Sequence, residues 1–217
     1  MTVVLGIAGG SGGGKTTLAQ AVYKQLGESA NVTYLKHDNY YKHKPHLTFD
    51  KRSQSNYDHP DSLDTALLVK HIRDLKAGNA AEIPNYDFST HLRKPDYTKE
   101  EPKSIILVEG ILIFSDASLL KELDLKIYVD CDSDIRLMRR IARDTSERDR
   151  TSEEVMAQYS ATVRPMHHEF VEPTKLLADI IIDCSGVRDS SVALNMITTY
   201  VKCEADARTV AFGADSK

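Results

Sequence analysis

The chain has 217 residues, of which 41 % are hydrophobic and 28 % are charged, so it is long enough for one well-buried α/β domain and too short for two large ones. Its formal net charge of −4 argues against nucleic acid as the main partner, and its three cysteines, without C-x-x-C spacing, exclude a disulfide framework and a thiolate zinc site. No apolar run approaches membrane-spanning length, so we predict a cytoplasmic protein that binds neither membrane nor nucleic acid.

A phosphate-binding loop joins the first predicted strand to the first predicted helix. Residues 3–8 are an apolar, β-branched run typical of a buried strand, and residues 17–26 carry apolar side chains at helical spacing. Between them lies a complete G-x-x-x-x-G-K-[ST] motif, whose lysine is expected at the β- and γ-phosphates and whose threonine is expected on Mg²⁺. The residues expected to hold the phosphates of a nucleotide are Gly9, Gly10, Ser11, Gly12, Gly13, Gly14, Lys15, Thr16 and Thr17.

The second predicted strand, residues 32–37, ends at Asp38. Ligands of a parallel sheet bind at the carboxyl ends of its strands, so Asp38 stands where chemistry would occur. Residues 39–60 follow without a clear period, and a loop of that length in a compact domain is usually functional or disordered. Four tyrosines in and beside the loop favour a substrate-binding role: Tyr34, Tyr40, Tyr41 and Tyr57.

The middle of the chain alternates helix and strand signals. A helix over residues 63–75 is expected, with Asp61 or Ser62 as its N-cap. Residues 82–97 alternate loosely, and proline in this segment excludes a central strand, so we predict an edge hairpin or a lid-like ribbon there.

Two further buried strands are predicted at residues 104–108 and 125–129. The first ends at Glu109, which places a second carboxylate at the same edge of the sheet as Asp38. The second leads into the acidic run 130–134, which begins like a calcium loop but lacks the glycine and the bidentate glutamate of that motif. We therefore interpret the run as a strand end followed by a helix N-terminus.

An arginine-rich segment follows. Arginine suits bidentate contact with phosphate, so we predict that part of this segment clamps phosphate and forms a lid over about residues 139–151. The capping box of residues 151–154 begins a new helix at the end of the lid. The six arginines are Arg136, Arg139, Arg140, Arg143, Arg148 and Arg150.

The C-terminal part supplies the last elements of the fold. A buried strand is predicted at residues 178–183 and an amphipathic helix at 191–201, whereas residues 204–217 are predicted to be a flexible tail. Strands that alternate with helices indicate an α/β fold with a parallel sheet covered by helices on both faces. We expect one P-loop kinase domain over residues 1–203.

Several P-loop chemistries can be weighed from the residues. A GTPase would carry an N-K-x-D guanine reader, which this sequence lacks, and a motor ATPase would be larger. Phosphoryl transfer to a small acceptor needs a carboxylate near the acceptor hydroxyl, an acidic group for Mg²⁺ and cations over the phosphoryl group. Asp38, Glu109 and the arginine segment supply these three parts.

The chain resembles the uridine kinase family over roughly residues 3 to 203. The resemblance rests on many separate blocks in one order, which makes chance an inadequate explanation. These blocks are residues 38–41, 56–61, 83–91, 109–112, 139–144, 147–150, 158–159 and 172–175.

The resemblance implies ATP as donor, uridine or cytidine as acceptor, and a homotetramer. Asp38 would accept the proton of the nucleoside 5′-hydroxyl, with Lys15 as the second catalytic residue. Thr16, Asp38 and Glu109 would surround Mg²⁺, and Arg143 and Arg148 would close over the ATP phosphates. The nucleoside would contact Asp38, Tyr41, Tyr57, Asp58, Tyr86, Phe88, His91, Arg140, Arg150 and Gln158.

The sequence departs from the family pattern at Asp149, where relatives commonly have glycine, and this puts lid flexibility and phosphate affinity in question. It also has Asn39-Tyr40 where Ser-Phe is more usual. Two alternatives stay open: a sugar-phosphate kinase of the phosphoribulokinase type and a nucleotide-sensing protein without turnover. Lys15, Asp38 and Glu109 together argue against the second of these.

Overall fold

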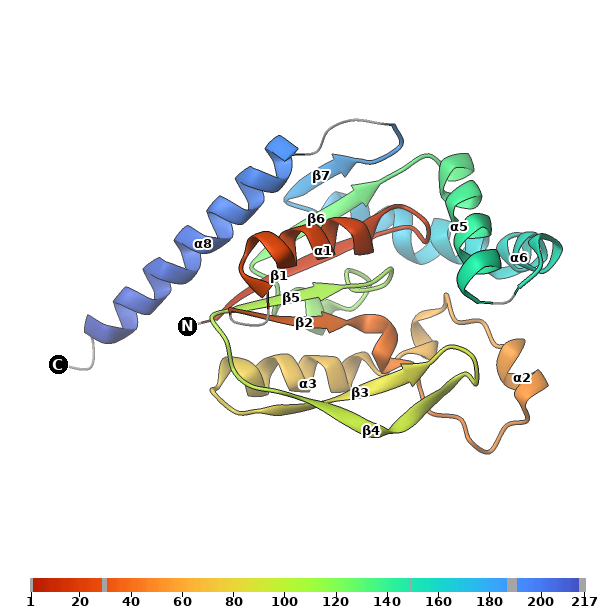
Figure 1. Ribbon diagram of the computed structural model, residues 1–217, viewed down its shortest axis with the longest axis horizontal. Coiled ribbons are helices and arrows are strands. Elements are labelled where there is room, and N and C mark those ends of the chain that lie inside the picture. The colour runs from red at the N-terminus through yellow and green to blue at the C-terminus, as the bar shows by residue number, and fades with distance from the viewer. Residues whose placement is uncertain (1, 29–30, 149, 187–190, 215–217) are drawn as a thin grey trace.

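A computed structural model describes residues 2–28, 31–148, 150–186 and 191–214 of the chain (Figure 1). It contains a five-stranded parallel sheet in the order β2-β5-β1-β6-β7 and a separate two-stranded antiparallel ribbon of β3 and β4. The predicted α/β fold with helices on both faces of a parallel sheet is confirmed. The strands are β1 (Val3–Gly9), β2 (Val32–Lys36), β3 (Ala81–Asp87), β4 (Leu92–Glu100), β5 (Ile105–Glu109), β6 (Leu125–Asp130) and β7 (Ile180–Asp183).

Two hydrophobic cores form because alternate residues of a strand point to opposite faces of the sheet. On one face, Val4 and Ala8 of β1 belong to the cluster that packs under α3, and on the other, Leu5 and Ile7 belong to the cluster that packs under α1 and α8. Every residue of β1 is buried, as expected for a strand with neighbours on both sides. The helices are α1 (Lys15–Gln25), α2 (Phe49–Ser53), α3 (Thr65–Lys76), α4 (Ala117–Leu120), α5 (Ser133–Glu147), α6 (Ser152–Gln158), α7 (Arg164–Met166) and α8 (Ser191–Ala214).

Helix α3 begins later than the sequence predicted. Its N-cap is Asp64, whose side chain accepts a hydrogen bond from the backbone N–H of Leu67, and neither Asp61 nor Ser62 caps it. Those two residues lie in a separate 3₁₀ turn (Pro60–Ser62), and Leu63 forms an antiparallel bridge with Tyr41. The bridge holds the segment that follows β2 against the start of α3.

The C-terminal region also differs from the prediction. Helix α8 continues to Ala214, so residues 204–214 are helical and the predicted tail from Glu204 was wrong for this stretch. Ala205 is buried in the core, and Arg208 donates hydrogen bonds to the Thr2 carbonyl (3.0 Å) and to the Asp124 carboxylate (2.9 Å). These contacts tie the end of the chain to its beginning. Strand β7 is an edge strand rather than a buried one, since the exposed fraction of Ile181 is 50 %.

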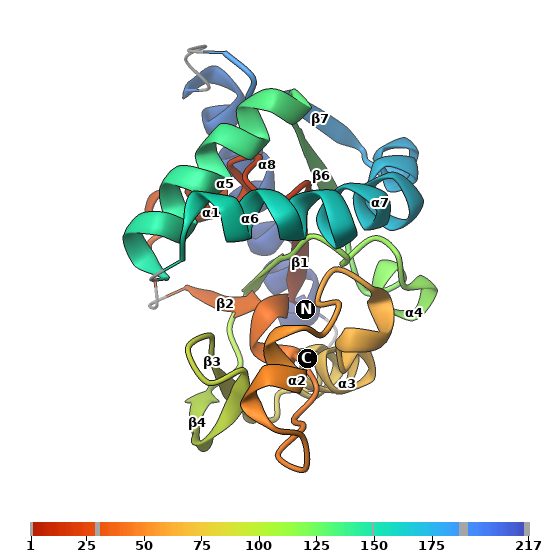
Figure 2. The same cartoon turned by 90° about the vertical axis from the view of Figure 1, so that its right-hand side faces the viewer.

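The carboxyl ends of the parallel strands lie at one end of the molecule. Viewed from that end, α5 and α6 lie on one side of the strand ends, and α2 and the β3–β4 ribbon lie on the other (Figure 2). The sheet thus brings the phosphate loop, the lid segment and the ribbon to the same end. Among the helices of the described residues, none has the length and apolar character needed to cross a membrane.

Candidate active site

The phosphate loop adopts a conformation that requires glycine. Gly12 and Gly14 have φ angles of 77° and 98°, in the left-handed region that side chains disfavour. A Cβ atom on Gly12 would also lie 2.3 Å from the carbonyl oxygen of Arg136, so α5 packs directly against the loop. Helix α1 begins at Lys15 with neither a side-chain cap nor an acidic residue in its first turn. Its N–H groups and partial positive charge are therefore available to an anion.

Lys15 is buried beside this helix terminus, with 7 % of its surface exposed. Its Nζ donates a hydrogen bond to the carbonyl oxygen of Gly10 at 3.0 Å. Burial lowers the pKa of Lys15, and the charges of Glu109 and Asp38 oppose that shift. The buried ammonium group and the uncapped helix N-terminus suit a polyphosphate, which is negatively charged. The two nearby carboxylates suit a cation bound to that polyphosphate.

Glu109, at the end of β5, meets the residue that follows the loop lysine. Its Oε1 accepts hydrogen bonds from the Thr16 hydroxyl (3.2 Å) and from the Tyr34 hydroxyl (3.5 Å). Burial raises the pKa of Glu109, and the nearby Lys15 opposes the rise. The sequence analysis noted Tyr34 as an aromatic residue but missed its contact with Glu109, because the pairing of β2 with β5 is a long-range feature.

These oxygen donors fit Mg²⁺. The ion prefers hard oxygen ligands, and it usually combines one or two carboxylates with water and substrate phosphates. Thr16 and Glu109 supply a hydroxyl and a carboxylate in contact with each other. Within the described part of the chain, no group of three or more His, Cys, Asp or Glu residues could hold a metal alone. The residues therefore fit a cation that arrives with a nucleotide rather than a permanent protein cage.

Asp38 lies in a 3₁₀ turn (His37–Tyr40) directly after β2. Burial raises the pKa values of Glu109, Asp58 and Tyr41, and the negative charge of Asp38 adds to all three rises. The preceding residue, His37, is buried, and its Nε2 is 3.1 Å from the Thr65 hydroxyl. His37 thus anchors the turn that presents Asp38.

The predicted nucleoside residues include a continuous chain of aromatic rings. Tyr41 contacts both Tyr57 and Tyr86 at centroid distances of 5.1 Å, and Phe88 contacts Tyr86 at 5.2 Å. His91 stacks on Tyr57 with an interplanar angle of 15° and a centroid distance of 5.0 Å. His91 has a φ angle of 55° in the turn between β3 and β4, so the ribbon holds this ring with an unusual backbone conformation.

Polar residues connect the phosphate loop with α6. Arg140 donates hydrogen bonds to the Ser11 hydroxyl (2.7 Å) and to Oε1 of Gln158 (2.9 Å). Arg150 donates to the same Gln158 oxygen at 2.6 Å. Asp58 is buried, and its pKa is raised by burial while the Arg140 charge opposes the rise. The structure thus brings Arg140, Arg150 and Gln158 together, as the resemblance implied.

The lid arginines gather around a residue to which the sequence analysis assigned no role. Asp144 of α5 is fully buried and lies within ion-pair distance of four arginines: Arg140, Arg143, Arg148 and Arg150. The Arg148 guanidinium also lies 4.8 Å from the ring centroid of Phe88, so the lid touches the ribbon. Asp149, the departure from the family pattern, lies outside the described residues.

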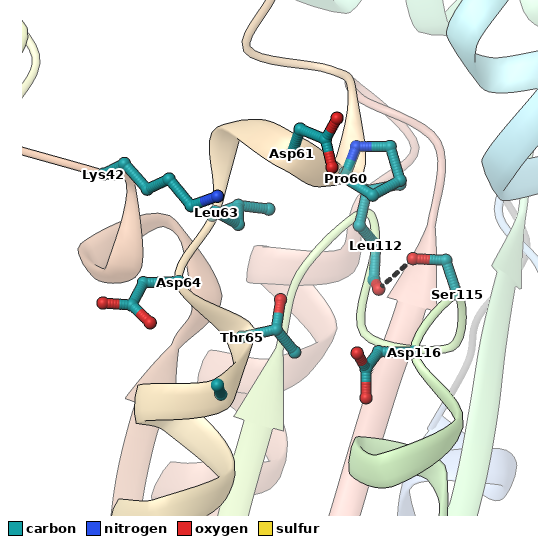
Figure 3. A pocket seen from close by; sticks show the side chains of 10 residues that line it. Lys42, Pro60, Asp61, Leu63, Asp64, Thr65, Leu112, Ser115 and Asp116 are labelled. Atoms are coloured by element: carbon teal, nitrogen blue, oxygen red, sulfur yellow. Dashed lines mark hydrogen bonds between the residues drawn. The ribbon is translucent and has the colours of Figure 1, made fainter.

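A cavity of about 300 Å³ is lined by residues from the segment before α3, from the start of α3 and from the segment after β5 (Figure 3). None of the residues predicted to bind ATP or nucleoside lines it. Two of its lining residues contact residues of the site or its support, since Leu63 forms a bridge with Tyr41 and the Thr65 hydroxyl contacts His37. Its lining consists of Lys42, Pro60, Asp61, Leu63, Asp64, Thr65, Ala66, Leu112, Ser115 and Asp116.

Comparison with known proteins matches this site to a family of kinases. The model of the phosphoribulokinase / uridine kinase family matches residues 4–191, which include the phosphate loop, Asp38, Glu109 and the arginine segment. The chain belongs to this family. Its fold is also that of phosphoribulokinase from Rhodobacter spheroides, with a TM-score of 0.63, 15 % identity and coverage of 88 % of this chain and 72 % of that one.

Curated relatives in the family are nearly full-length matches. A uridine kinase of Macrococcus caseolyticus is 47 % identical over 201 residues, which cover 93 % of this chain and 96 % of the relative. A uridine kinase of Clostridium perfringens is 48 % identical over 200 residues, which cover 92 % and 95 %. At this similarity the chain is a kinase.

Proposed function

We propose that the protein transfers the γ-phosphoryl group of ATP to the 5′-hydroxyl of uridine or cytidine, giving ADP and the nucleoside monophosphate. The observation that carries this proposal is that the chain of aromatic rings begins at Tyr41, which closely follows Asp38 in the sequence, while the Asp38 charge also acts on Lys15. Rings can hold a flat base at low entropic cost, and a few polar groups then read its edge. The similarity to proteins named uridine kinase supports the same acceptor.

In the proposed reaction, Asp38 orients the 5′-hydroxyl and accepts its proton as the oxygen attacks the γ-phosphorus and the bond to ADP breaks. General-base catalysis of this kind typically contributes about 10²–10⁴-fold in rate. Lys15 and the helix N-terminus stabilise the phosphate charges, and Arg143 and Arg148 close over them. Mg²⁺, held by Thr16, Asp38 and Glu109, supplies charge neutralisation to the phosphates when bound.

His91 is the proposed reader of the base. A neutral imidazole can donate or accept a hydrogen bond depending on its tautomer, so it suits both the 4-oxo group of uridine and the 4-amino group of cytidine. Burial and the nearby arginines lower the pKa of His91, which favours the neutral ring this role needs. We therefore propose that both pyrimidine nucleosides are substrates and purine nucleosides are not.

The test is a comparison of turnover with one preparation of the protein. Uridine, cytidine, adenosine and ribulose 5-phosphate are each supplied with Mg·ATP, and formation of ADP and of the phosphorylated product is measured. Efficient turnover of uridine and cytidine alone is expected. Preferential turnover of ribulose 5-phosphate would establish the sugar-phosphate alternative, and binding of ATP without any turnover would establish a nucleotide sensor.

We also propose a cytoplasmic homo-oligomer, a tetramer by the family resemblance. Helix α8 supports association because Val192, Met196 and Tyr200 form an exposed apolar stripe at a spacing of four residues. Analytical ultracentrifugation of the parent and of a variant with Met196→Glu tests this proposal. An equal, monomeric mass for both proteins would contradict it.

A further inference from the structure

Asp144 is the most deeply buried charged group of the lid segment, with none of its surface exposed. A lone buried carboxylate is costly, so its partners explain why it is tolerated. It lies on α5 one helical turn after Arg140, directly after Arg143 and one turn before Arg148. Arg150 approaches from the segment that follows the helix.

The two oxygens of this carboxylate have different partners. Oδ1 is 2.7 Å from Nη2 and 2.9 Å from Nε of Arg143, and it is 3.4 Å from Nη1 of Arg148. Oδ2 is 3.5 Å from Nε of Arg140 and 3.7 Å from Nη1 of Arg150. One oxygen thus serves the two arginines assigned to the ATP phosphates, and the other serves the two assigned to the nucleoside.

The contacts on the two oxygens also differ in strength. Arg143 is hydrogen-bonded to Oδ1, whereas Oδ2 and Nε of Arg140 have no hydrogen-bond partner among the described residues. The four arginines share the Asp144 charge, and the carboxylates of Asp58 and Asp38 also act on Arg140 and Arg148. The pKa of Arg148 is lowered, first by burial and then by the Arg143 charge. The arginines outnumber the carboxylates around them, and this surplus of positive charge suits an anionic ligand.

We infer that Asp144 is a positioning residue that couples the donor and acceptor halves of the site through its two carboxylate oxygens. When the phosphates of ATP bind Arg143 and Arg148, these two arginines move away from Oδ1. The Asp144 carboxylate then interacts with Arg140 and Arg150 alone. The longer contacts on Oδ2 then shorten, and Gln158, which both arginines already contact, holds them in the acceptor geometry. ATP binding therefore improves acceptor binding, and by linkage the acceptor improves ATP binding to the same degree. This inference rests on the proposed division of the arginines between ATP and the acceptor.

The experiment measures that coupling directly. Calorimetry gives the Kd of a non-hydrolysable ATP analogue with Mg²⁺, in the absence and presence of the acceptor that the turnover comparison identifies, and the Kd of that acceptor with and without the analogue. In the parent we expect each ligand to tighten the other at least about 5-fold, the lower end of typical allosteric couplings. In Asp144→Asn, which keeps the size of the side chain and removes its charge, the factor should fall to near 1.

Asp134→Asn is the matched control, because it makes the same chemical change on an exposed residue of the same helix and should keep the parental coupling. A second variant tests the inference even if Asp144→Asn does not fold. Arg143→Gln removes the main partner of Oδ1 and so mimics its withdrawal by phosphate. The acceptor should then bind without nucleotide as tightly as it binds the parent with the analogue.

The outcomes separate the inference from the proposed function. Uridine and cytidine that bind neither the parent nor its nucleotide complex would refute the proposed acceptor, and the coupling is then measured with ribulose 5-phosphate. Parental coupling that survives in folded Asp144→Asn would overturn the inference. So would an acceptor affinity of Arg143→Gln that still depends on nucleotide, or the absence of coupling in the parent.

Discussion

A pair of substitutions at His91 separates what its backbone contributes from what its ring contributes. The φ angle of His91 is 55°, and a left-handed conformation costs a residue with a Cβ atom about 1–2 kcal/mol. Glycine removes that strain, but it also makes the unfolded chain more flexible, at a cost of about 0.4–1 kcal/mol. We therefore expect His91→Gly to be more stable than His91→Ala by about 0.5–1 kcal/mol, or roughly 1–4 °C in Tm for a chain of this size.

The difference in stability between the two variants measures the backbone strain alone, because both variants lose the same ring. The stacked contact with Tyr57 disappears in each, and an aromatic pair of this kind is worth about 0.5–1.5 kcal/mol. Urea and thermal unfolding, followed by circular dichroism, measure the stability difference. Steady-state kinetics should show that both variants raise the KM for uridine about 2- to 10-fold and leave the KM for ATP unchanged. An alanine variant as stable as the glycine variant would refute the strained turn, and a parental uridine KM in both would refute the role of the ring.

Three further outcomes are expected. Lys15→Ala should lower kcat by at least about 10²-fold while circular dichroism shows a folded protein, because a fixed cation at the phosphates is lost; near-parental turnover would show that the loop does not hold ATP. Asp38→Asn should lower kcat by at least about 10²-fold with little change in the Kd of uridine or Mg·ATP, whereas a large loss of Mg·ATP affinity would make Asp38 a metal ligand first. Burial lowers the pKa of His37 to about 4 from 6.5, so the neutral ring stabilises the fold above pH 6.5 and that contribution is lost as pH falls toward 4. His37→Gln should reduce this acid-induced loss by up to about 3 kcal/mol, measured by urea unfolding from pH 7 to 4, and an unchanged pH profile would contradict the assignment.

The sheet and the phosphate side of the site were predictable because their signals are local. Strands β1 and β5 are buried on both faces and are therefore nearly continuous apolar runs. Asp38 follows β2 and Glu109 ends β5. The carboxyl edge of a parallel sheet brings the ends of neighbouring strands together, and this does not depend on the conformation of the loops. The role of the aromatic residues in the ribbon could be predicted only with the family resemblance. Aromatic residues that alternate loosely along a strand indicate a small hydrophobic core as readily as a site for a base.

The features that the sequence did not reveal depend on long-range contacts. The N-cap of helix α3 is Asp64 rather than Asp61 or Ser62, because Leu63 is held in a bridge with Tyr41. The second half of α8 has no clear apolar period, and it is held by Arg208, whose partners Thr2 and Asp124 are remote in the chain. Asp144 has the sequence pattern of a solvated charge in an arginine run. Its spacing of four residues from Arg140 and from Arg148 was the available signal, but only the fold shows that the arginines enclose it.

The central place of β1 has a consequence for how the protein is made. Its two neighbours in the sheet, β5 and β6, come much later in the chain and begin at Ile105 and Leu125. Because a chain is synthesised from its N-terminus, β1 leaves the ribosome before either neighbour has been made. A segment that is wholly buried in the finished protein is then open to chaperones and to wrong pairing with other nascent chains. A nascent chain can therefore pair β1 with both of its neighbours only after residue 130 has emerged.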